Sequence, residues 1–134
     1  MTREMCKEMG LYNVDKWYGK RQFFNCVNLS EILGTPNFGI WVLSSDDMKY
    51  GADVLNHPDF IDTVAEKLED DLFLIPSSIH EILAIRKETV EDPRRLSAMI
   101  RTINIDEVAS DLWLGKDPLL YKRGSFEISK AIMN

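Results

Sequence analysis

The densest group of chemically versatile side chains in this sequence lies at Ser77, Ser78, His80 and Glu81, around Ile79. On an extended segment side chains alternate, so Ser78 and His80 point to one side and are candidates for nucleophile and base. A catalytic pair needs converging side chains, but such neighbours stand roughly parallel, about 7 Å apart at their Cα atoms. The pattern therefore favours a tight bend whose hydroxyls and imidazole satisfy backbone groups, with a hydrolase-like or ligand-binding site as the alternative.

The other motifs that carry chemistry are incomplete. The segment His80-Glu81-Ile82-Leu83-Ala84 begins like a zinc-protease motif, but alanine replaces the second histidine and the segment has the pattern of a strand. Cys6 and Cys26 have no histidine nearby, so reduced thiols are favoured over a zinc site or a disulfide. No glycine-rich phosphate loop is recognisable. We therefore predict no catalytic set, no cofactor and no metal site.

Composition narrows the class of protein and of partner. The chain has 134 residues, 45% of them hydrophobic and 28% charged, which is typical of a single globular domain over residues 1–134. Its formal net charge of -6 repels phosphate backbones and anionic lipid, so we predict neither a nucleic-acid nor a membrane partner. Without a signal peptide or a long apolar run, a cytoplasmic location is expected.

The elements that must position the bend become readable from residue 38 onward. Three short apolar runs are bounded by turn residues, and we predict a strand in each: Phe38–Leu43, Leu72–Ile75 and Ile79–Ile85. Prolines in the first turn and apolar stripes with helical spacing predict helices over residues 58–70 and 93–104. Two further short runs, at residues 119–122 and 125–128, predict a terminal hairpin around Arg123-Gly124.

This order of elements predicts an α+β fold. Two strand–helix–strand crossovers around a central hairpin match the split βαβ, ferredoxin-like pattern, in which both helices cover one face of a mainly antiparallel sheet. Residues 1–36 have aromatic side chains without a steady period, and we predict an irregular N-terminal arm there. The second face of the sheet would then be left to solvent, to this arm or to a second copy of the chain.

A family resemblance adds to this interpretation. The stretch from Asp71 to Leu83, with Pro76-Ser77-Ser78-Ile79-His80-Glu81 at its centre, resembles the C-terminal part of an uncharacterised bacterial family of unknown function. The strand at residues 41–44, the step Tyr50-Gly51-Ala52, residues 99–104 and residues 119–121 are also similar to it. The resemblance covers roughly residues 38–128, taken as the family-like core, and leaves residues 1–37 outside. It implies no activity.

Taken together, these observations predict a non-enzymatic cytoplasmic binding or interaction module. Its partner is an unidentified protein or small molecule, and a homodimer is left open. The alternative is a hydrolase-like or ligand-binding site at Ser77, Ser78, His80 and Glu81. The environment of the His80 ring separates the two, because a site requires the ring to face a cavity and a group from another segment. A structural bend instead requires the serines and His80 to bond nearby backbone groups.

Overall fold

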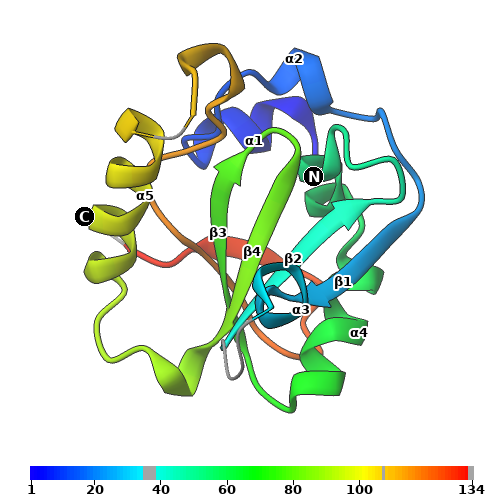
Figure 1. The fold of residues 1–134 in the computed structure, drawn as a ribbon. Helices are drawn as coiled ribbons and strands as arrows, with labels where there is room; N and C mark the ends of the chain where they lie inside the picture. Colours follow the sequence, from blue (N-terminus) through cyan, green and yellow to red (C-terminus); the bar gives the residue numbers. More distant parts are fainter. Residues whose placement is uncertain (35–38, 107, 133–134) are drawn as a thin grey trace.

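The computed structural model describes residues 1–34, 39–106 and 108–132. An antiparallel sheet of six strands runs through the molecule, with helices on both sides (Figure 1). The strands are β1 (Phe24–Asn28), β2 (Ile40–Ser45), β3 (Leu72–Ser78), β4 (Glu81–Arg86), β5 (Leu119–Tyr121) and β6 (Ile128–Lys130). The α-helices are α1 (Arg3–Glu8), α2 (Val14–Trp17), α3 (Leu29–Leu33), α4 (Pro58–Leu68) and α5 (Arg94–Asp106). The 3-10 helices are η1 (Gly51–Asn56), η2 (Lys87–Thr89) and η3 (Ser110–Leu112).

The predicted α+β class and the antiparallel sheet are confirmed, and the predicted strands correspond to β2, β3 and β4. Phe38, the first residue of one predicted strand, lies outside the described residues. Helix α4 begins at Pro58, as the proline and the acidic first turn predict. The terminal hairpin is present as β5 and β6, but β6 starts at Ile128, so the connection is longer than Arg123-Gly124.

The prediction that both long helices cover one face of the sheet is wrong. Side chains alternate along β3, and Leu72 and Leu74 belong to the same core cluster as the α4 side chains Ile61 and Val64. The other side of β3, through Phe73 and Ile75, packs with Leu96 and Ile100 of α5. The two helices therefore lie on opposite faces, with α5 at the left and α4 at the lower right of Figure 1.

Strand order explains this arrangement. In a ferredoxin-like sheet the last crossover returns past the first strand, but here the order is β1-β2-β4-β3-β5-β6, so β5 pairs with β3. Both crossovers, β2–α4–β3 and β4–α5–β5, therefore step in the same direction across the sheet, although β2 and β4 run antiparallel. Because such crossovers keep one hand in nearly all proteins, antiparallel starting strands place their helices on opposite faces.

The N-terminal segment is not an irregular arm, because it supplies three helices, α1, α2 and α3, and an edge strand of the sheet. Helix α1 is capped by Thr2, whose Oγ1 accepts the N–H of Met5 at 3.1 Å. Cys6 and Trp17 are fully buried in the α4-side core, and the Trp17 indole donates to the carbonyl of Tyr12. Strand β1 pairs along its length with β2 and so occupies the place beside β2 that a ferredoxin-like fold gives to its last strand.

Candidate functional site

The bend between β3 and β4 places its serines in backbone hydrogen bonds. Ser77 is buried, and its Oγ donates to the carbonyl of Glu81 at 3.4 Å. Ser78 Oγ accepts the backbone N–H of His80 at 3.1 Å, which is a local turn of the kind that serine often makes. The β3–β4 register also shifts between Ile75 and Ser78, around Pro76, which has no N–H to donate.

The imidazole of His80 also bonds a backbone group. Its Nδ1 accepts the backbone N–H of Tyr50 at 3.0 Å, so this nitrogen carries no proton and the ring is neutral. Burial lowers the pKa of His80 below its ordinary value, and the charge of Lys49 lowers it further, against a small opposing effect of Asp47. The Tyr50 ring lies against the imidazole with centroids 5.4 Å apart.

Ser78 and His80, which are close in the sequence, bond different backbone groups and not each other's side chains. The bond between Ser78 and His80 joins a hydroxyl to a backbone N–H, so the hydroxyl and the imidazole do not form a nucleophile–base pair. Glu81 is half-buried, and desolvation raises the pKa of its carboxyl while the Ser77 hydroxyl lowers it. The geometry favours a structural role for the bend, and Glu81 is the residue of the four that lines a hollow described below.

The bend is held by the step Tyr50-Gly51-Ala52 at the start of η1. Gly51 N–H donates to the carbonyl of His80 at 3.1 Å, and Ala52 N–H donates to that of Ile79 at 3.2 Å. A Cβ on Gly51 would overlap the His80 carbonyl oxygen and lie 2.9 Å from the Cα of Ser44. Glycine is therefore required here by close backbone approach. The sequence offered Tyr50-Gly51-Ala52 only as part of a resemblance, and its contact with the bend comes from the structure.

A buried carboxylate joins this region to the N-terminal segment. Asp53 in η1 is fully buried, and its two oxygens accept the backbone N–H groups of Gly19 at 2.8 Å and Arg21 at 2.9 Å. The amide of Asn56 donates to the same carboxylate at 2.6 Å. Buried acids need such partners. Sequence reasoning missed this role because Asp53 lies in a strongly acidic stretch that has the composition of a solvated surface.

An extensive apolar hollow lies on the α5 side of the sheet, at the β1 end that α5 leaves uncovered. We call this feature the sheet groove; its volume is about 590 Å³. Its lining residues are Asn25, Val27, Leu29, Ile32, Val42, Ser44, Asp46, Met48, Glu81 and Leu83. Val42 and Leu83 pair across β2 and β4, so they share one sheet face with Ile75, the β3 partner of Leu83 that α5 covers.

Sequence reasoning missed the sheet groove. The alternation of Val42 and Ser44 or of Glu81 and Leu83 fits a strand facing either solvent or core, and no local signal says how far a helix will reach across the sheet. The available signal was indirect. Ile32, in a short helical turn expected over residues 30–34, and Met48, outside the predicted strands and helices, are apolar residues that are 56% and 68% exposed at the groove.

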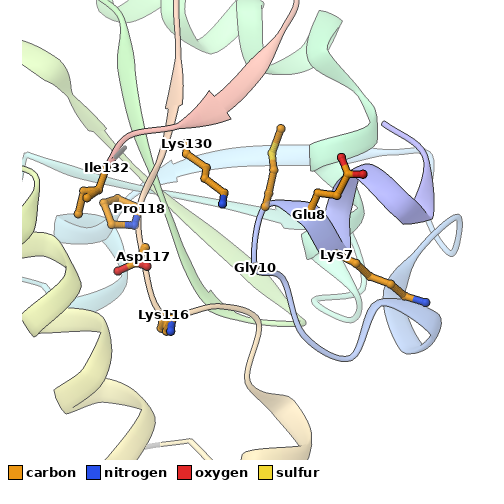
Figure 2. Close-up of a pocket in the computed structure, with 9 residues that line it drawn as sticks. Lys7, Glu8, Gly10, Lys116, Asp117, Pro118, Lys130 and Ile132 are labelled. Atoms are coloured by element: carbon orange, nitrogen blue, oxygen red, sulfur yellow. The ribbon is translucent and has the colours of Figure 1, made fainter. Parts of the chain in front are cut away.

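A second hollow, of about 290 Å³, has mixed charge. Lys7 and Glu8 of α1 line one side of the hollow, and Lys116, Asp117 and Lys130 near β5 and β6 line the other (Figure 2). The Lys7 side chain extends away from the other two lysines, so the three ammonium groups do not converge on one point (Figure 2). Asp117 is itself engaged, because it accepts a hydrogen bond from Ser97 at 2.8 Å. This arrangement does not define an anion site.

Neither a metal-binding cluster nor a membrane-spanning helix occurs in the part of the chain that the structure describes. Among these residues, no three histidine, cysteine, aspartate or glutamate side chains lie close enough together to hold a metal ion. None of the described helices has the length and apolar character needed to cross a bilayer.

Fold and site together define an α+β domain with a six-stranded antiparallel sheet and an open apolar groove at one end of it. The chain belongs to a family of unknown function, DUF5688, whose model matches residues 1–123. That match includes the N-terminal residues that the sequence resemblance left outside. No curated protein and no solved structure matches the chain.

Proposed function

We propose that this domain is a non-enzymatic binding module and that the sheet groove receives a segment of a partner protein. The observation that carries the proposal is the open half of the sheet face. Leu83 lies on β4, an inner strand of the sheet, yet it is only half-buried, and Ile32 and Met48 beside it are mostly exposed. Apolar side chains gathered in a concave surface are a typical mark of an interaction site.

The shape of the groove favours an elongated partner over a small molecule. Small ligands are usually enclosed over most of their surface, whereas here two of the apolar lining residues are themselves more than half exposed. An extended or helical segment can cover such a surface with alternate apolar side chains. The small-molecule partner that the sequence left open is therefore the weaker candidate.

The charged side chains that line the sheet groove indicate which residues the partner segment contains. Among the described residues, the charged side chains that line the groove are Asp46 and Glu81, both acidic, and none is a lysine or arginine. A segment with apolar side chains and a lysine or arginine matches this lining, because the cation can pair with a carboxylate at the edge of the apolar surface. Together with the net charge of -6, the acidic lining also argues against a nucleic-acid ligand.

We place this module in the cytoplasm of a bacterium. The support for the location is the state of the cysteines, since Cys6 is a buried free thiol and Cys26 a half-buried one. Free thiols are typical of reducing compartments. The support for bacterial origin is the resemblance of the Pro76–Glu81 motif described above.

The proposal can be tested with Nile red, a neutral dye that fluoresces on apolar protein surfaces. We expect the dye to bind the native protein and the double variant Ile32→Ser/Met48→Ser to lose at least half of the signal. The matched control is Ile105→Ser/Met5→Ser, which removes the same residue types where they are exposed outside the groove. Equal losses in the two variants, with both folded by circular dichroism, would contradict the groove as the binding surface.

A further inference from the structure

The two edges of the sheet differ in how they are protected. Edge strands expose unpaired backbone groups, and proteins usually blunt them with short length, charge, proline or a bulge. Strand β6 is only Ile128–Lys130 and ends in a lysine. Strand β1, Phe-Asn-Cys-Val-Asn over residues 24–28, is longer, contains no charge and no proline, and pairs with β2 without a register shift.

Strand β1 is the last strand on its side of the sheet, so no other described strand pairs with its outer edge. In the described structure the elements with extensive contact along β1 are β2 and the short helix α3. Because α3 contacts β2 as well, it lies over the sheet face, and none of the described backbone groups pairs with the outer side of residues 24–27. Phe23, directly before the strand, is 74% exposed and is the most exposed large apolar side chain of the described residues.

We propose that β1 pairs with β1 of a second copy of this chain, antiparallel and about a two-fold axis at Cys26. This register overlaps all five residues of the strand. Cys26 faces Cys26 of the second copy, and Asn25 faces Val27. It also places Phe23 beside Leu29 of the second copy, which covers an exposed aromatic side chain with an apolar one. Because the interface is isologous, it closes as a dimer.

Charge at the ends of β1 favours a second copy over an unrelated strand. The chain enters the strand from Lys20 and leaves it toward Glu31, whereas the guanidinium of Arg21 is already paired with Asp47 of its own chain. In an antiparallel pair the entering end of one copy lies beside the leaving end of the other. Lys20 of each copy therefore approaches the glutamate of its mate, at both ends of the interface. This inference concerns the sheet edge and does not depend on what the sheet groove binds.

The register makes a covalent test available. Cys6 is fully buried, whereas Cys26 is half-buried and sits on the proposed axis. We expect the full chain to sediment as a dimer at tens of micromolar. A short bismaleimide, to which each thiol adds across one double bond, should link two copies through Cys26. Cys26→Ser should abolish the link while leaving sedimentation unchanged.

A charged substitution on the outer edge of β1 provides a second test of the dimer. Asn25→Lys should raise the dissociation constant of the dimer at least tenfold. Ser129→Lys introduces a lysine on the opposite edge strand and should leave the dimer intact. Thermal melting shows whether each variant folds. A wild-type chain that stays monomeric at 100 µM overturns the inference. So does a dimer that Asn25→Lys does not weaken and that bismaleimide does not link, because it uses another surface. A monomer that pairs through β1 with a peptide of another protein overturns it too.

Discussion

At the scale of single residues, the polar groups of the β3–β4 bend bond backbone atoms of their surroundings. Tyr50 N–H is held by the His80 ring, and Gly51 N–H by the His80 carbonyl. A peptide N–H that is removed from water costs free energy when it is left unpaired. The histidine thus has a structural use that does not require any chemistry at its ring.

Gly51→Ala should destabilise the protein by about 3 kcal/mol, the upper part of the range for overpacked positions. The new methyl group meets backbone atoms of His80 and Ser44, which cannot move aside as a flexible side chain could. The measurement is the free energy of unfolding in urea. Gly39→Ala is the matched control, because no described atom comes within 4 Å of a Cβ placed at Gly39. Similar losses for both variants would be inconsistent with the close approach.

His80 should make stability depend on pH below about 6.5, the ordinary pKa of histidine. Because the pKa of His80 is lowered in the folded protein, the unfolded chain takes up the proton first as the pH falls. Stability is then fully present above pH 6.5 and is lost as the pH drops toward the folded pKa.

His80→Asn isolates this contribution, because the asparagine oxygen can still accept the Tyr50 N–H but does not titrate. Glu81 remains in both proteins, and its raised pKa acts in the opposite direction. We expect the difference in unfolding free energy between wild type and variant to shift in favour of the variant as the pH is lowered from 7.5 to 5. A difference that stays constant over this range would refute the neutral, accepting imidazole.

At the scale of elements, the sequence predicted strands and helices well where a period is repeated. The stripe of α4 and the apolar runs of β3 and β4 each contain enough buried positions to reveal their type. Helices α1 and α2 have six and four residues, with one and two of them buried, so no period could appear in them. Their order is set by tertiary contacts such as the burial of Trp17.

The sequence could not predict which face of the sheet each helix covers, for a different reason. A helical stripe reveals that a helix is buried, but the face it covers depends on strand order. That order follows from β1, which takes the edge beside β2 and leaves β3 as the place for β5. An aromatic-rich segment without periodicity therefore decided the topology of the later, well-predicted elements. The sheet groove follows from the same fact, since α5 covers only the β3 side of its face.

Asp53→Ala should loosen the link between η1 and the N-terminal segment and cost about 3 kcal/mol, because the backbone N–H groups of Gly19 and Arg21 lose a buried, charged acceptor. Unfolding in urea, followed by tryptophan fluorescence, measures the loss and reports on Trp17. Asp59→Ala is the control, because the Asp59 side chain is exposed on the first turn of α4, and its loss should stay below about 1 kcal/mol. Equal effects would mean that the buried contacts of Asp53 contribute nothing specific.

At the scale of the whole molecule, α5 covers the β3–β5 half of its sheet face, whereas the β1 half carries only the short helix α3 beside the sheet groove. The closed half contains Phe73, Ile75 and Ile85 under α5. The open half contains the sheet groove and ends at the uncharged edge of β1. Pairing of two copies through β1 would join their sheets, and the grooves would then lie on either side of the new interface.

The central claim is that the sheet groove binds a partner segment with apolar and basic side chains. Its most direct test is to select a peptide from a random library on the wild-type domain and to titrate it into isotope-labelled protein by NMR. The account predicts a lysine- or arginine-containing peptide that shifts the amide signals of Val27, Val42 and Leu83. Shifts centred on Tyr50 and His80 or on the lysines of Figure 2, or a library without any binder, would contradict it.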